Sequence, residues 1–348
     1  MDWPDWTEWP DWQSENNYEY DLLLYHPRQS LGVKSAGTQN EEEYDQDNEW
    51  IRFGLRLGVT TALHPFEYAK VLMQIGFEPI APVPGRTLFG RPTMILPNVF
   101  KYAQFIKDVD GFSGCFRGLS AKIVGNMLSA YYSEKVADEM GLEAAPADKR
   151  ADSAAPTPEE DSKQLDEQFR KQLKRNVVVH TAGVVISHPF HVISIRMMAQ
   201  FVGREKLYTG LWQSIREIWS QEGIAGFFSG FMPRLICDLG CLVISSSATY
   251  LVSKYLVRER EGRVYVSSIS QFVVSSMFYP YHVVSTSMIV NGSRLKAGSM
   301  PSMEQYSDWR DCYSKLKAAG QHKRGNSLFF RYTSRALTNS YESKKLMN

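Results

Sequence analysis

Three copies of one two-part pattern constrain the fold of this chain more than any other feature. In the first part, a proline lies between two ring-bearing residues near the end of an apolar stretch, at Pro65, Pro189 and Pro280. In the second part, a glycine is followed five residues later by a phenylalanine; the glycines are Gly111, Gly223 and Gly325. Proline and glycine keep the same order, 46, 34 and 45 residues apart. Such self-similarity predicts a body built from one repeated structural unit, with both residue sets as structural elements of it.

Each unit opens with a helix candidate long enough to cross a membrane. The three candidates cover residues 50–76, 175–201 and 268–290. At a rise of 1.5 Å per residue, about 20 residues span the hydrocarbon core of a bilayer. The repeated proline lies inside each candidate and is expected to kink it, because proline removes one helical hydrogen bond.

Two of the three units contain a second membrane-spanning candidate. These candidates cover residues 119–140 and 231–257, whereas only seventeen residues follow Arg331 in the third unit, without an apolar run. Short amphipathic helices with aromatic and basic residues are expected near residues 99, 211 and 309, as at a membrane–water boundary. The sequence therefore predicts an all-α membrane protein with about five transmembrane helices. Three complete units would have six, and the last of these is expected to be missing.

The regions outside the repeats differ sharply in charge from the body. Residues 1–50 carry thirteen acidic and two basic side chains, although the whole chain has a net charge of only +1. Trp3, Trp6, Trp9 and Trp12 recur at a period of three, which is typical of a docking peptide or of a disordered tail. The predicted organisation is a disordered tail at 1–49, repeats at 50–140 and 175–257, an acidic Ala-Pro linker at 141–174, and a truncated repeat at 258–348.

The repeated pattern resembles the signature of the mitochondrial solute carriers over about residues 50–332. That signature is Pro-x-[Asp/Glu]-x-x-[Lys/Arg]-x-[Lys/Arg], followed by [Asp/Glu]-Gly-x4-aromatic-[Lys/Arg]-Gly. Longer blocks are similar to the mitochondrial carrier homolog branch of this family: HPFEYAKVLMQIGFEPIAP at 64–82, SHPFHVISIRMMAQFVGRE at 187–205, GFFSGFMPRL at 226–235 and RGNSLFFR at 324–331. The resemblance implies a degenerate carrier bundle in the mitochondrial outer membrane. It also implies insertion of α-helical, chiefly tail-anchored, proteins and a role in apoptosis through a pro-apoptotic partner.

The acid–base positions of the carrier signature are mostly lost. These are the second, fifth and seventh positions after each proline. They hold Glu67, Lys70 and Leu72 in the first unit, His191, Ser194 and Arg196 in the second, and His282, Ser285 and Ser287 in the third. A transporting carrier needs acid–base pairs between these helices as a gate. With most of them absent and the last helix missing, we expect a polar groove open to lipid instead of a sealed pore.

Seven residues near the prolines or in mid-helix are candidates for lining this groove and contacting clients. They are Glu67, Lys70, His188, His191, Arg196, Asp238 and Tyr279. Asp238 is the sharpest candidate, because it lies inside the most apolar span. Two roles are open for it: pairing across the groove with Lys70 or Arg234, or a structural i,i+4 pair with Arg234. A snorkelling side chain is the alternative for Lys70.

Other chemistry finds little support in the sequence. No GxxxxGK[ST] or GxSxG motif is present, which argues against nucleotide binding and enzymatic hydrolysis. The spacing of His188 and His191 is explained better by the repeat than by a metal, and no cofactor or nucleic-acid partner is expected. The favoured function is a membrane insertase with the bilayer and tail-anchored clients as partners; a solute carrier and a receptor or scaffold are the alternatives.

Overall fold

Long helices dominate the computed structural model, which describes residues 39–86, 90, 92–142, 158–255 and 260–332. The five long helices are α1 (Gln39–Gln74), α3 (Leu119–Glu139), α4 (Pro158–Ala199), α6 (Phe231–Tyr255) and α7 (Arg260–Val290). The shorter ones are α2 (Val99–Gly114), α5 (Leu211–Gly226), α8 (Trp309–Ala318) and the 3-10 turn η1 (Lys296–Gly298). The predicted all-α class and the expected order of long and short helices are confirmed.

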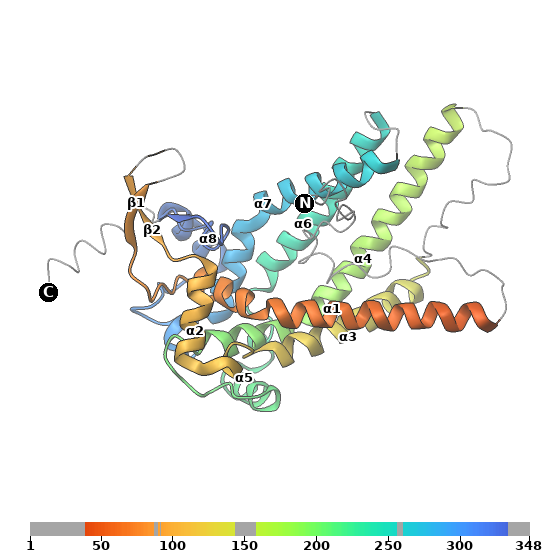
Figure 1. The fold of residues 1–348 in the computed structure, drawn as a ribbon. Helices are drawn as coiled ribbons and strands as arrows, with labels where there is room; N and C mark the ends of the chain where they lie inside the picture. The colour runs from red at the N-terminus through yellow and green to blue at the C-terminus, as the bar shows by residue number, and fades with distance from the viewer. Residues whose placement is uncertain (1–38, 87–89, 91, 143–157, 256–259, 333–348) are drawn as a thin grey trace, which may run out of the picture.

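The long helices converge at one end of the molecule and diverge at the other (Figure 1). The short helices α2, α5 and α8 lie around the convergent end. Helix α3 packs along α4, and α6 packs along α7. Pro65, Pro189 and Pro280 lie inside α1, α4 and α7, so each helix continues through its proline. The repeat seen in the sequence is therefore a repeat in space, with one proline-containing helix for each unit.

Two helices in the described ranges are both long and apolar enough to cross a membrane. They cover Asp166–Ala199 in α4 and Phe231–Val252 in α6. Helices α1, α3 and α7 are also at least 21 residues long, but polar residues interrupt their apolar stretches. The five-span topology accordingly stays a prediction.

Two predicted boundaries of the irregular regions are wrong. Helix α1 begins at Gln39, inside the predicted tail, and α4 begins at Pro158, inside the predicted linker. Both extensions are polar, and glutamate, glutamine and lysine prolong a helix readily once it is nucleated. Residues 1–38, with the four tryptophans, 143–157 and 333–348 lie outside the described residues.

Contacts with α6 hold the polar N-terminal part of α4 from Asp166 onward. Lys254 and Tyr250 of α6 both donate hydrogen bonds to Asp166 of α4, and Phe169 stacks on Tyr250 with ring centroids 4.2 Å apart. Helix α7 likewise begins at Arg260, earlier than the predicted residue 268. The sequence alone does not reveal such partners, because the contacting residues are more than eighty positions apart.

A small antiparallel sheet, which the sequence did not predict, lies beside α2 and α8 (Figure 1). Its strands are β1 (Val83–Arg86), β2 (Pro92–Leu96) and β3 (Arg331–Tyr332), in the order β1-β2-β3. Strand β3 is the end of the third Gly-x4-Phe signature. Arg331 also forms an ion pair with Glu78 and donates a 2.8 Å hydrogen bond to the carbonyl of Pro97. The third signature thus ends in a strand, whereas the first two are followed directly by α3 and α6.

Candidate functional site

Matched contacts join the first unit to the second and the second unit to the third. The Ser194 hydroxyl of α4 donates to the carbonyl of Gly118 at 3.0 Å, and the Ser285 hydroxyl of α7 donates to that of Gly230 at 2.8 Å. Each serine lies five residues after its proline, and each glycine ends a Gly-x4-Phe signature. A Cβ added to Gly118 or Gly230 would lie 2.8 or 2.5 Å from the serine carbonyl oxygen. Glycine is required there by this approach and by φ angles of +87° and +71°.

The third unit is joined to the first in a different way. Tyr332 occupies the position equivalent to Gly118 and Gly230, and Lys70 occupies the position equivalent to the serines. Instead, buried Gln74 of α1 donates to the Tyr279 hydroxyl of α7 at 3.0 Å, and that hydroxyl donates to the carbonyl of Arg324 at 3.2 Å. Among the described residues, these contacts join the third unit to the first at the convergent end, where Gln74 ends α1.

One flank of α1 is uncovered beyond that closed end. Within residues 54–63 of α1, every residue but Thr60 and Thr61 is exposed, whereas in the equivalent residues 178–187 of α4 only Val185 is exposed. In Figure 1 the N-terminal half of α1 diverges from α6 and α7. Within the described residues, no helix covers this flank of α1.

Charged and polar side chains from five helices form one chain of contacts and electrostatic neighbours. We call this set the polar cluster; its members are Glu67 and Lys70 of α1, Lys122 of α3, His188 and His191 of α4, Arg234 and Asp238 of α6, and Tyr279 and His282 of α7. On the α1 side, Lys122 forms an ion pair with Glu67, and the Glu67 side chain is 33% exposed. The Nδ1 atom of His64 lies 3.8 Å from the same carboxylate. Glu67 is thus accessible and already tied to α3.

The Lys70 ammonium lies over an aromatic ring at the boundary between α1 and α7. Its Nζ atom is 5.9 Å from the centroid of the Tyr279 ring, a distance compatible with a cation–π contact. The Tyr279 ring in turn lies 6.2 Å from the ring of His282. Lys70 is half-buried, so its charge is held within the bundle and is not fully turned out to the interface.

On the other side of the polar cluster, a chain of contacts links α4 to α6. An Arg234 N–H lies 3.3 Å from Nδ1 of fully buried His188, and Nε2 of His188 lies 3.0 Å from the carbonyl of Ser229. Arginine only donates, so Nδ1 accepts and Nε2 carries the proton that it donates to Ser229. Arg234 also lies 3.5 Å from Asp238, the i,i+4 pair that formed the structural alternative for Asp238. His188 is therefore a packed structural residue, while Asp238, 27% exposed, remains accessible.

His191 occupies the centre of the polar cluster. It lies in electrostatic range of Arg234, His282 and Lys122, and its buried Nε2 atom has no hydrogen-bond partner within the described residues. An unsatisfied ring nitrogen beside cationic groups favours a water molecule or a polar guest at this point. In the part of the chain that the structure describes, no group of three or more His, Cys, Asp or Glu side chains converges as a metal site would require.

Arg196 is not part of the groove. Its side chain is fully buried, and it makes hydrogen bonds of 2.6 and 2.8 Å to the two carboxylate oxygens of Glu222. A third bond of 3.0 Å reaches the carbonyl of Ile289. Sequence reasoning placed Arg196 among the candidates by its carrier-motif position, but it ties α4 to α5 and α7 in the core and is closed to a client.

Sequence reasoning also left several residues out of the candidate set. Lys122 and His282 belong to the polar cluster, and the repeat register could have pointed to His282, because it is equivalent to His191. Ser194 and Ser285 share a register position in the same way. By contrast, Arg324 contacts Gln74, which is 250 positions away in the sequence, and no sequence pattern predicts this contact.

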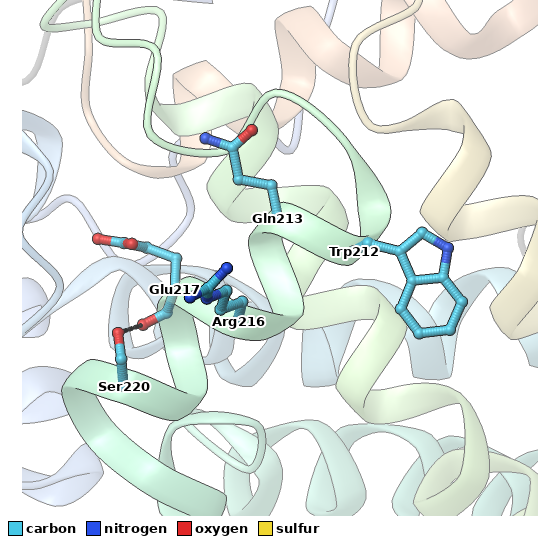
Figure 2. A pocket seen from close by; sticks show the side chains of 5 residues that line it. All are labelled: Trp212, Gln213, Arg216, Glu217 and Ser220. Carbon is cyan, nitrogen blue, oxygen red and sulfur yellow. Dashed lines mark hydrogen bonds between the residues drawn. The ribbon is translucent and has the colours of Figure 1, made fainter.

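A shallow depression of about 560 Å³ lies on the surface of α5. Figure 2 shows its lining side chains, all from this one helix: Trp212, Gln213, Arg216, Glu217 and Ser220. The Ser220 hydroxyl donates to the carbonyl of Glu217 at 3.0 Å. Trp212 is 82% exposed, and Trp219 on the same helix is 60% exposed. Exposed indoles on a short helix suit a membrane–water interface, so we regard the depression as helix surface and not as a binding site.

Comparison with known proteins gives consistent matches. A profile described as mitochondrial carrier protein matches residues 169–260. The chain is 38% identical to mitochondrial carrier homolog 2 of Bos taurus over 279 residues, which cover 79% of this chain and 91% of that protein. It is 32% identical to mitochondrial carrier homolog 1 of Mus musculus, over 82% of this chain and 77% of that protein. Over about half of each chain it is 27% identical to the mitochondrial 2-oxodicarboxylate carrier of Rattus norvegicus.

Proposed function

Because the chain belongs to the mitochondrial carrier homologs, a branch of the mitochondrial carrier family, we propose that it acts in the mitochondrial outer membrane as an insertase. Its substrates in this proposal are α-helical membrane proteins, chiefly tail-anchored ones. The family places the chain in a mitochondrial membrane. The choice of the outer membrane and the insertase activity are the proposal, and the activity requires no enzymatic step.

One observation carries the proposal: the uncovered flank of α1 adjoins the polar cluster. A tail-anchored client must move a short polar segment across hydrocarbon before its apolar helix settles. A single charge at the bilayer centre costs about 2.5–3.5 kcal/mol on insertion scales. Glu67, Lys70 and Asp238 are partly exposed and offer such a segment hydrogen-bond and ionic partners along the way. The groove would lower the barrier without nucleotide hydrolysis.

Reconstitution tests the proposal directly. Purified protein in liposomes is mixed with a radiolabelled tail-anchored client, and insertion is read from protease protection of its C-terminal tail. We expect insertion well above that in empty liposomes, and equal protection in both would refute the activity. Asp238→Arg, which reverses a groove charge, should lower insertion. Glu139→Arg makes the same charge change at an exposed end of α3 and is the matched control.

Solute transport is the second candidate function, because one matched relative is named a 2-oxodicarboxylate carrier. A sealed alternating-access pore requires equivalent contacts at all three junctions, and the junction between the third and first units is built differently. Uptake of a radiolabelled 2-oxodicarboxylate into the same liposomes distinguishes the two functions. We expect uptake no faster than in empty liposomes; protein-dependent uptake would favour the carrier function.

A receptor or scaffold for a pro-apoptotic protein is the third candidate. The acidic, tryptophan-rich residues 1–38 are its sequence basis. Deletion of residues 1–38 separates the roles, because α1 begins at Gln39 and is left whole. Insertion that persists in this variant while partner binding is lost would assign docking to the N-terminal segment and insertion to the bundle.

A further inference from the structure

Two small residues of α3, four positions apart, allow α3 to pack closely on α4. Gly125 of α3 lies against the turn of α4 that holds Ser187 and Phe190: a Cβ added to it would be 2.8 Å from the Phe190 Cβ and 3.5 Å from the Ser187 carbonyl oxygen. One turn further along α3, the Ser129 hydroxyl donates to the carbonyl of Gly183 at 3.2 Å. From Gly125 to Ser129 the residue numbers rise by four on α3, while those of the contacted residues on α4 fall by four, from Ser187 to Gly183. The two helices are therefore antiparallel. Small residues at this spacing allow two helix backbones to approach closely.

The next unit repeats this arrangement at equivalent positions. The Cys237 thiol of α6 lies 3.6 Å from the carbonyl of Phe278 of α7, and Cys241 packs in one buried cluster with Val274. Gly125 lies seven residues after Gly118, and Cys237 lies seven residues after Gly230. Both meet the position two residues before the next repeat proline, and Cys241 and Ser129 meet the position six residues before it. The geometry is therefore a property of the repeat and not of one helix pair.

The same positions on α1 have no covering helix within the described residues. They are Val59 and Leu63, six and two residues before Pro65, and Leu55 lies one turn earlier on the same face. Their exposed fractions are 63% for Leu55, 36% for Val59 and 40% for Leu63. On α4 and α7 the positions matching Val59 are buried. We call this face of α1, Leu55-Val59-Leu63, the α1 seat.

We infer that the α1 seat binds the transmembrane helix of a client, antiparallel to α1, through two small residues four positions apart. This inference rests on the proposed insertase function and specifies how the substrate is recognised. Glu67 lies four residues after Leu63, so the face of the seat runs directly into the polar cluster. A helix in the seat has its apolar part on α1 and its next turn beside the Glu67–Lys122 pair. That continuity argues for a client with a polar flank and against a lipid acyl chain.

Site-specific photocrosslinking in liposomes tests the inference. A benzophenone amino acid replaces Val59, Leu63 or, as a matched control, Leu57, which is 37% exposed but points to another side of α1. The probe is a tail-anchored protein whose leucine helix carries one Gly-x3-Ser pair, copied from Gly125 and Ser129; a second probe has leucine at both places. We expect the Gly-x3-Ser probe to crosslink at Val59 and Leu63 at least about fivefold more than at Leu57, and about fivefold more than the all-leucine probe.

Register provides a further check. In the antiparallel arrangement, Leu63 should crosslink near the glycine of the probe and Val59 near its serine, four residues later. Equal yields at Leu57 and Leu63, or equal yields for both probes, would overturn the seat. Crosslinks from Val59 and Leu63 to residues 1–38 of the same chain, or to a second copy, in place of the probe, would also overturn it.

Protease protection in the same liposomes separates the two proposals. Insertion of the probe without seat crosslinks overturns the seat and leaves the insertase function standing. Seat crosslinks without insertion above the level of empty liposomes support helix binding and overturn the insertase function. Leu63→Trp fills the seat at an exposed position and should lower insertion of the Gly-x3-Ser probe at least about fivefold relative to Leu57→Trp; equal insertion by both variants would contradict the seat.

Discussion

Replacing Gly230 by alanine should destabilise the bundle at the junction between its second and third units. The φ angle of Gly230 is +71°, where a residue with a Cβ costs about 1–2 kcal/mol. The new Cβ would also lie 2.5 Å from the backbone oxygen of Ser285, which cannot rotate away as a side chain could. Overpacking of this kind typically costs about 1–3 kcal/mol. We expect the free energy of unfolding to fall by about 2–5 kcal/mol.

The control is Gly292→Ala. Gly292 has a φ angle of +78°, is exposed, and has no atom within 4 Å of an added Cβ. It therefore incurs the conformational cost alone, about 1–2 kcal/mol. SDS titration of the purified protein in mixed micelles measures both variants. Equal losses at Gly230 and Gly292 would refute the close junction, whereas Gly118→Ala should behave like Gly230→Ala if the two junctions are truly equivalent.

Two further predictions concern buried groups away from the groove. Arg196→Met leaves the Glu222 carboxylate without its two hydrogen bonds and should lower the free energy of unfolding by about 3–5 kcal/mol in the same titration. The double variant Arg196→Met/Glu222→Met should regain a large part of this loss. A double variant as unstable as the single one would argue against the broken ion pair as the cause. Burial raises the pKa of the Cys312 thiol to about 12. Iodoacetamide at pH 8 should therefore alkylate Cys312 about a thousandfold more slowly than a free cysteine, as measured by mass spectrometry. An alkylation rate comparable to that of free cysteine would show that α8 is not packed as described.

Much of the architecture could be predicted from the sequence because the repeat is written locally. The start of α3 at Leu119, the end of α7 at Val290 and the surface helices α2, α5 and α8 lie where apolar periodicity and the Gly-x4-Phe signature place them. Helix ends in polar sequence could not be found in this way. The N-terminal part of α4 contacts Tyr250 and Lys254 of α6 through Asp166, and these partners are remote in sequence.

Most of the predicted site residues lie in the polar cluster, but their burial could not be predicted from the sequence. Sequence position alone gave equal standing to Arg196, His188 and Lys70. In the structure, Arg196 is fully buried against Glu222 and His188 is fully buried against Ser229, while Lys70 remains partly accessible. Burial is decided by which helix packs on which face, and the repeat pattern does not encode that choice.

The sequence by itself determined that this chain is a threefold helical repeat with mostly lost acid–base positions, because prolines, signature glycines and apolar stretches act within a few turns of their own position. Only the tertiary structure decided that two junctions are closed by a serine on a glycine carbonyl while the third is held by Gln74 and Tyr279. Likewise, only packing decided that Leu55, Val59 and Leu63 of α1 are exposed among the described residues. The physical reason is that the exposure of a side chain depends on all the elements that pack around it, and not on its own stretch of sequence.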